Sequence, residues 1–149
     1  MAERKPINIA LQGGGSHGAF TWGVLDRLLE DDRLEVAAIS GTSAGAMNAV
    51  AFADGWVAGG AEGARAKLAS FWRSVGRKGR FSPVQRTPWD VLTGNWSIEN
   101  SPGFLWFDAM ARAFSPYVAN PFDYNPLRDV VRREIDFDRV RRCEGPRLF

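Results

Sequence analysis

The chain has 149 residues, of which 45% are hydrophobic and 24% are charged. This length and balance are typical of one globular domain, and they exclude two complete domains, a disordered chain and a membrane-spanning helix. One cysteine and one histidine exclude an internal disulfide and any zinc site that needs two histidines or several cysteines. A net charge of +2 predicts no nucleic-acid partner, and the N-terminus lacks the apolar core of a signal peptide, so we expect a cytoplasmic protein.

The first half of the chain alternates predicted strands with predicted helices. Apolar runs predict strands at residues 7–11 and 36–40, and helical spacing predicts helices at residues 19–29 and 46–53. The apolar stripe expected to face the core from the first helix consists of Phe20, Val24, Leu25 and Leu28. This order of elements predicts an α/β fold with a mainly parallel sheet.

The second half of the chain is less regular. Its expected elements are helices at residues 61–75, 104–114 and 125–135, an irregular segment at 76–103 and the start of a strand at 146–149. The irregular segment holds three prolines, and a long loop in a compact domain is typically a lid or a binding loop. Because only two clear parallel strands precede the last one, we expect residues 1–149 to be the N-terminal portion of a single, longer domain.

Seven Lys and Arg residues and no acidic residue lie between Arg65 and Arg86, interleaved with Phe71, Trp72 and Phe81. A basic and aromatic stretch of this kind is typical of a surface that contacts an anionic membrane or a nucleic acid. A solvated helix face and loop explain the pattern equally well. Peripheral contact with a membrane is therefore one of two interpretations of this segment.

Residues 41–45 fit the pattern G-x-S-x-G, in which a serine occupies a strained turn between a strand and a helix. The pattern is short, but here an apolar strand precedes it and an apolar helix follows it, as a nucleophilic serine requires. Ser43 is therefore the candidate nucleophile, and Gly41 and Gly45 are small residues that let the turn close. The alternative is a glycine-serine turn with a structural role only.

Residues 13–18 follow the first strand and have two chemical interpretations. The run satisfies G-x-G-x-x-G, typical of a nucleotide-binding loop, but that fold needs an acidic residue after the second strand, and the nearby acidic residues all precede its end. In the other interpretation, Gly13, Gly14 and Gly15 present backbone N–H groups to an oxyanion. A glycine loop and a serine turn on adjacent parallel strands meet at one sheet edge, so the pair is more specific than either motif.

Ser43 needs a base, and the sequence does not assign one. His17 precedes the serine, whereas the triad of α/β-hydrolases places its histidine after the nucleophile and the acid. Asp54, next to Gly55, is interpreted as the C-terminal cap of the helix that follows Ser43. The remaining candidates, which the sequence does not rank, are Asp90, Asp108, Asp123 and Asp129.

Together, the glycine run at 13–18 and the serine motif at 41–45 resemble the N-terminal half of the bacterial patatin-like phospholipases, most clearly over residues 7–55. The resemblance implies a three-layer α/β/α sandwich, a Ser-Asp dyad, a lipid or other acyl-ester substrate, and no metal or organic cofactor. It also implies that Ser43 is the nucleophile and that Gly18 lets the following helix begin. The oxyanion-hole residues that it implies are Gly13, Gly14, Gly15 and Ala44.

The chain departs from the family pattern in two places. His17 stands where many members carry Arg or Lys, and the chain contains no Asp-Gly-Gly or Asp-Gly-Ala, the motif of the family's catalytic aspartate. We interpret that aspartate as lying in a remaining C-terminal part of the same domain. The expected activity is that of a serine acyl-ester hydrolase acting on lipid or lipid-like esters. The alternatives are a non-catalytic lipid-binding relic and a nucleotide-binding module.

Overall fold

The computed structural model describes residues 4–79, 92, 94, 105–106, 109 and 125–149. The chain divides into two compact units, Met1–Gly76 with Leu127–Phe149, and Arg77–Pro126. Few residues of the second unit are described, among them the end of one helix and the first residue of another. The contacts described below lie within the first unit.

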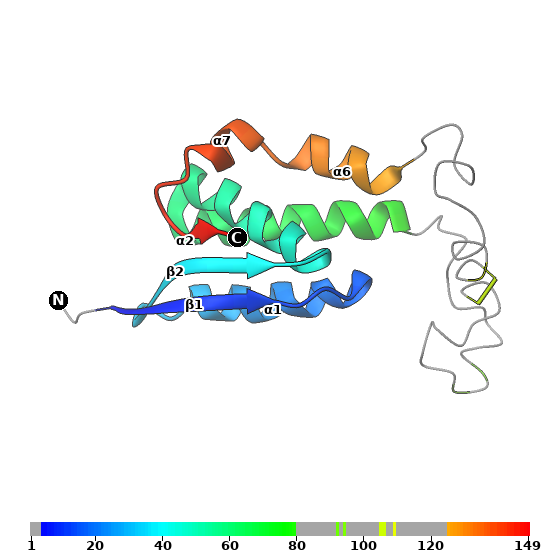
Figure 1. The fold of residues 1–149 in the computed structure, drawn as a ribbon, viewed down its shortest axis with the longest axis horizontal. Helices are drawn as coiled ribbons and strands as arrows, with labels where there is room; N and C mark the ends of the chain where they lie inside the picture. Colours follow the sequence, from blue (N-terminus) through cyan, green and yellow to red (C-terminus); the bar gives the residue numbers. More distant parts are fainter. Residues whose placement is uncertain (1–3, 80–91, 93, 95–104, 107–108, 110–124) are drawn as a thin grey trace. The chain divides into compact units, whose positions relative to one another are not determined.

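A parallel sheet of three strands forms the centre of the first unit (Figure 1). Its strands are β1 (Lys5–Leu11), β2 (Leu34–Gly41) and β3 (Arg147–Leu148), in the order β1-β2-β3. Leu11 is paired with Gly41, so β1 and β2 end side by side. The predicted α/β class, its parallel sheet and the predicted C-terminal strand are confirmed.

Two helices cover one face of this sheet: α1 (Gly18–Leu29), which follows a short 3-10 turn, η1 (Gly15–His17), and α2 (Ala44–Gly79). The later helices α6 (Pro126–Glu134) and α7 (Phe137–Arg141) contact α2, through Glu134 and Arg139 respectively. Along β1 and β2, Leu11, Val36 and Ile39 are buried, whereas Asn8 and Ala37 are exposed. Of the expected three-layer sandwich, the described residues therefore supply the sheet and the helical layer on its buried face.

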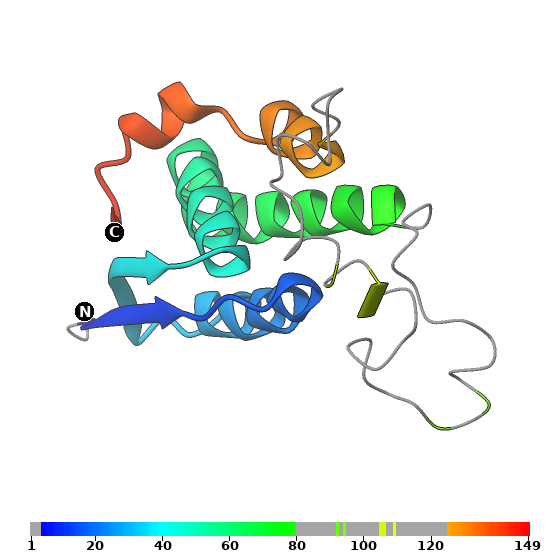
Figure 2. The same cartoon turned by 45° about the vertical axis from the view of Figure 1, so that its right-hand side comes forward.

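α2 changes direction at Gly59 and Gly60, where the backbone leaves the helical region (Figure 2). Its two halves cross at Gly55, where an added Cβ would overlap the carbonyl oxygen of Gly63 and lie 2.6 Å from the Cα of Ala64. The predicted helix end at Asp54-Gly55 is wrong, because the first half of α2 continues beyond them to the bend.

We expect Gly55→Ala to lower the free energy of unfolding by about 1–3 kcal/mol, because the methyl group forces the two halves of α2 apart. Gly76→Ala is the matched control in the same helix, since a Cβ at that position meets nothing within 4 Å, and it should be neutral or slightly stabilising. Urea denaturation of the wild type and both variants measures the difference. Equal stabilities for the two variants would contradict the close crossing.

α1 turns a different face to the core than its sequence pattern predicts. Of the predicted stripe only Leu25 is fully buried, and Phe20 and Val24 are 79% and 45% exposed. Trp22 and Leu29 pack against the core instead. Apolar residues occur on more than one side of this helix, and the pattern alone favoured the wrong side.

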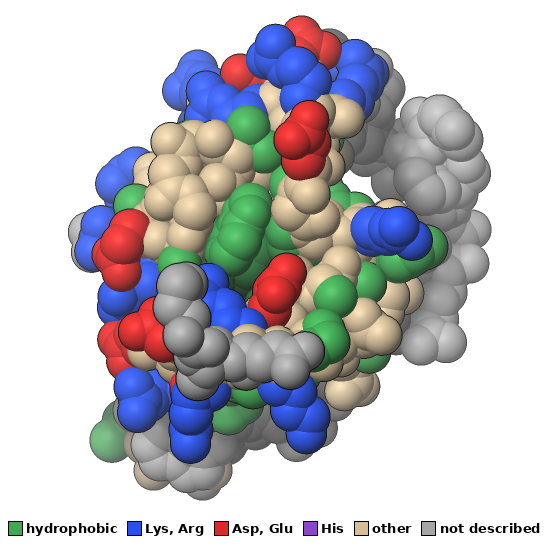
Figure 3. Space-filling view, turned by 90° about the vertical axis from the view of Figure 1, so that its left-hand side faces the viewer, with side chains coloured by type: hydrophobic (Ala, Val, Ile, Leu, Met, Phe, Trp, Pro, Cys, Tyr) green, Lys and Arg blue, Asp and Glu red, His purple; other side chains and the backbone are tan. Residues whose placement is uncertain are grey.

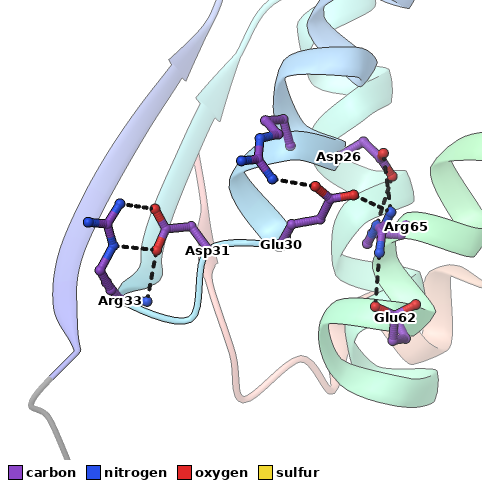
Figure 4. Close-up of polar contacts among 7 residues, drawn as sticks. Asp26, Glu30, Asp31, Arg33, Glu62 and Arg65 are labelled. Atoms are coloured by element: carbon purple, nitrogen blue, oxygen red, sulfur yellow. Dashed lines mark hydrogen bonds and ion pairs between the residues drawn. The ribbon is translucent and has the colours of Figure 1, made fainter.

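Ion pairs join α1 to the second half of α2 (Figure 4). The guanidinium of Arg65 lies 2.9 Å from Asp26 on α1, 2.8 Å from Glu30, the C-cap of α1, and 3.0 Å from Glu62 on its own helix. The hydrogen bond to Asp26 is the main reason that the pKa of Arg65 is raised. This arrangement fixes α1 along α2.

The prediction of a basic and aromatic surface at residues 65–86 is wrong in part. Phe71 and Trp72 are buried, and Arg65 and Lys67 pair with carboxylates. Arg73 is exposed, whereas residues 80–86 lie outside the described residues. On the face shown in Figure 3, Lys and Arg side chains also lie among Asp and Glu side chains.

The predicted helix after Asn125 is confirmed as α6, but α7 has no counterpart in the predicted elements. Asp136 caps α7 by accepting hydrogen bonds from the backbone N–H groups of Asp138 and Arg139 at 3.1 and 3.0 Å. The N–H of Arg139 is the main cause of a lowered pKa at Asp136. A helix of five residues is too short for apolar spacing to reveal it.

The predicted irregular segment starts later than expected, because α2 extends to Gly79. The rest of that segment, apart from Leu92 and Gly94, and most of the predicted helix at 104–114 lie outside the described residues. Within the described parts of the chain, no helix is both long enough and apolar enough to cross a membrane.

Candidate active site

Ser43 lies on a sharp turn between β2 and α2. Its φ of 51° makes it the one residue other than glycine with a positive φ in the described part of the chain. Such a conformation is strained for a residue with a Cβ and is common at functional sites. Met47 donates its backbone N–H to the carbonyl of Ser43 at 3.1 Å, so the first turn of α2 begins at the serine. The Ser43 side chain is exposed.

Two glycines allow this turn to lie directly against β1. A Cβ on Gly41 would lie 2.6 Å from the carbonyl carbon of Gly45, and a Cβ on Gly45 would overlap the carbonyl oxygen of Leu11. Thr42 donates its N–H to the same Leu11 oxygen at 3.3 Å. The glycines of G-x-S-x-G are therefore sites of close backbone approach.

The glycine loop after β1 lies beside the serine. A Cβ on Gly13 would be 3.2 Å from the Cβ of Ser43. Gly14 and Gly15 have φ values of 140° and 57°, which favour glycine. The structure thus brings the two sequence motifs together at the carboxyl ends of β1 and β2.

Several backbone N–H groups of these motifs make no hydrogen bond in the described ranges. Among them are the N–H groups of Gly13, Gly14, Gly15 and Ala44. Gly15 and Ala44 are the first residues of η1 and α2, where no intrahelical acceptor exists. Free N–H groups at a helix N-terminus next to a serine can stabilise negative charge that develops on a substrate oxygen.

A buried polar contact behind the site was not predicted from the sequence. Asn48, fully buried on α2, donates to the carbonyl of Gly18 at 3.0 Å and accepts from the indole Nε1 of Trp72 at 2.7 Å. Gly18 itself leaves no room for a side chain, since a Cβ would lie 2.7 Å from the Trp72 ring and 2.8 Å from Ala44. Asn48 thereby joins the start of α1 to both halves of α2. Its position in an otherwise apolar helix was the available signal, because a buried amide needs partners.

The structure assigns no base to Ser43 among the described residues, since none of their side chains makes a hydrogen bond to its hydroxyl group. Asp54 is ten residues along α2 from Ala44, about 15 Å on the rise of 1.5 Å per residue. Asp129 lies on α6. The other candidates, Asp90, Asp108 and Asp123, lie outside the described residues.

Asp54 forms buried ion pairs and does not have the predicted capping role. Its side chain is fully buried, 3.0 Å from Lys67 Nζ and 3.2 Å from Arg139 Nη1, and it accepts a hydrogen bond from the backbone N–H of Asp136 at 3.3 Å. Asp54 therefore ties both halves of α2 to α7.

A hollow of about 460 Å³ opens at the edge of the sheet where the motifs meet. Its lining includes Ala10, Gln12, Thr42 and Phe149. This hollow offers space for a ligand beside the residues of the turn. Among the described residues, no group of three or more His, Cys, Asp or Glu side chains is placed to hold a metal ion.

Comparison with known proteins agrees with this arrangement. The family model described as patatin-like phospholipase matches residues 9–148, nearly the whole chain. Neither the curated proteins nor the solved structures contain a match to the chain.

Proposed function

Because the chain belongs to the patatin-like phospholipase family, we propose that it is a serine acyl-ester hydrolase that acts on lipid esters. Ser43 is the nucleophile in this proposal. The observation that carries it is the strained φ of 51° at Ser43, next to the unpaired backbone N–H groups of Gly13, Gly14, Gly15 and Ala44. A structural turn would not require this combination.

In the proposed reaction, the Oγ of Ser43 attacks the ester carbonyl carbon, and the serine proton passes to a base. The N–H groups of the glycine loop and of Ala44 hold the oxyanion of the tetrahedral intermediate. The intermediate collapses, the alcohol leaves with the proton from the base, and an acyl-enzyme remains. Water, activated by the same base, then releases the fatty acid and restores Ser43.

The base in this proposal is an aspartate, which forms a dyad with Ser43. No described side chain makes a hydrogen bond to the Ser43 hydroxyl. We therefore place the aspartate either among the undescribed residues of the chain or in a further part of the same domain. The second choice follows the prediction that residues 1–149 form the N-terminal portion of a single domain. No metal or organic cofactor takes part in the proposed reaction.

Fluorophosphonate labelling followed by intact-mass measurement tests the proposal. We expect one covalent adduct on the wild-type protein and none on Ser43→Ala. Ser70→Ala is the control, since Ser70 lies in the second half of α2, where its hydroxyl donates to Glu134 at 2.7 Å, and it should be labelled like the wild type. Labelling of Ser43→Ala would place the nucleophile elsewhere, and an unlabelled wild type would favour the non-catalytic lipid-binding relic.

Membrane contact is a separate part of the proposal. Of the basic stretch at residues 65–86, two candidates for contact with lipid head groups remain: the exposed cations Arg73 and Lys78 near the end of α2. No acidic partner of either is found in the described ranges. Such cations attract anionic lipid head groups. Their neutralisation should reduce sedimentation of the protein with anionic vesicles but not with neutral ones.

A further inference from the structure

The glycine loop carries a contact that the proposed reaction does not yet use. The side chain of His17 folds back over its own loop, and its Nδ1 lies 3.1 Å from the carbonyl oxygen of Gly14. A carbonyl oxygen accepts hydrogen bonds and does not donate them, so Nδ1 must carry the proton. The backbone N–H of His17 donates to the same oxygen, also at 3.1 Å. The Gly14 carbonyl is thus held by two donors from one residue.

Holding this carbonyl fixes the peptide between Gly14 and Gly15. The peptide is trans, and in a trans peptide the carbonyl and the N–H point in opposite directions. With the Gly14 carbonyl directed toward His17, the Gly15 N–H is directed away from it. That N–H is one of the unpaired donors described above.

A peptide between two glycines is unusually free to turn over. Glycine populates positive and negative φ with similar ease, and both residues here have positive φ. Rotation of this peptide by about half a turn would replace the Gly15 N–H with the Gly14 carbonyl oxygen. An oxygen in that position would repel an oxyanion.

We propose that His17 is a positioning residue of the oxyanion hole, whose Nδ1–H holds the Gly14–Gly15 peptide in the orientation that presents the Gly15 N–H. This inference rests on the proposed function, because it assigns the loop to oxyanion binding. His17 has no direct role in proton transfer from Ser43. A neutral imidazole is sufficient, since only the proton on Nδ1 is needed.

Substitutions of His17 test whether the donor at the position of Nδ1, and not the imidazole ring itself, is what the site needs. The amide nitrogen of Asn occupies nearly the position of Nδ1 and also donates, whereas the amide of Gln reaches the position of Nε2. We expect His17→Asn to keep kcat for a p-nitrophenyl ester within about twofold of wild type. We expect His17→Gln and His17→Ala to lower kcat about 3- to 10-fold, the value of one ordinary hydrogen bond, with KM unchanged.

The tautomer provides a readout that does not depend on activity. Because the chain has one histidine, ¹⁵N-labelled protein without a histidine tag gives a single pair of ring nitrogen signals. In the neutral imidazole, we expect the proton on Nδ1 and a bare Nε2. A proton on Nε2, or equal kcat for the Asn and Gln variants, would overturn the role of His17 alone. The kinetic measurements use the full-length protein, including any further part of the domain, and no turnover by its wild type would instead overturn the proposed function together with this inference.

Discussion

Asp54→Asn is expected to lower the free energy of unfolding by about 3 kcal/mol, the lower end of the range for breaking a buried ion pair from one side. The Asp54 carboxylate is fully buried, and it faces the cations of Lys67 and Arg139 at 3.0 and 3.2 Å. The neutral amide keeps the shape of the side chain but leaves Lys67 without a carboxylate partner among the described residues, whereas Arg139 keeps its ion pair with Asp136 at 3.3 Å. The lower end of the range applies because Lys67 and Arg139 are 23% and 34% exposed and can reach water.

A double-mutant cycle tests whether the interaction itself carries this effect. Asp54→Asn combined with Lys67→Met should be less destabilised than the sum of the single variants, by about 1 kcal/mol. Arg141→Met is the control, because its pair with Asp138 is exposed at 78% and 79%, and exposed pairs contribute little. Urea denaturation measures all four variants, and an Asp54→Asn protein as stable as Arg141→Met would refute a stabilising role.

Asp54 also shows where sequence patterns stop being informative. The Asp54-Gly55 pair after an apolar helix predicts a helix end because glycine is common just beyond the last helical residue, and this signal assigns no partner to the carboxylate of Asp54. Here its partners are Lys67 and Arg139, which are distant along the chain. No local pattern reveals a partner at that distance, so the end of the helix was predicted several residues too early.

The parts of the candidate site that the sequence predicts are those with local causes. The strand, glycine loop, second strand and serine turn each depend on neighbouring residues, and two parallel strands necessarily bring their following loops to one edge. Ser43, Gly13 and Gly45 therefore lie together as their motifs predicted. Asn48 and Trp72, which support the start of α1 from behind, depend on the bend in α2. The sequence shows that Asn48 stands in an apolar helix, but it does not show which residues pair with its amide.

The buried face of α1 also depends on contacts that are distant in the sequence. Phe20 and Val24 have the right spacing for the core but are exposed, while Trp22 and Leu29 pack inward. Helical spacing defines a set of possible faces, and packing against the rest of the fold decides among them. In the observed orientation, Arg65 reaches Asp26 and Glu30. Those ion pairs join residues more than one element apart, so the choice is a tertiary one.

Gly45→Ala is expected to impair the site more than any other glycine substitution that leaves φ unaffected. The added methyl group would overlap the carbonyl oxygen of Leu11 and lie 2.8 Å from its carbonyl carbon. Backbone atoms cannot rotate away as a side chain can, so β1 and the start of α2 must separate. The hydrogen bond of 3.3 Å from Thr42 to Leu11 would lengthen or break, and the serine would move away from the glycine loop.

We expect this variant to lose about 2–3 kcal/mol of stability by overpacking and at least about tenfold in the rate of fluorophosphonate labelling, since an oxyanion donor that loses its position gives losses of about 10²–10³. Gly23→Ala is the matched control, because a Cβ on this α1 residue meets nothing within 4 Å and alanine favours the helix. It should be labelled at the wild-type rate with equal or higher stability. If Gly45→Ala were labelled as fast as Gly23→Ala, the close approach of β1 and α2 would not be what positions Ser43.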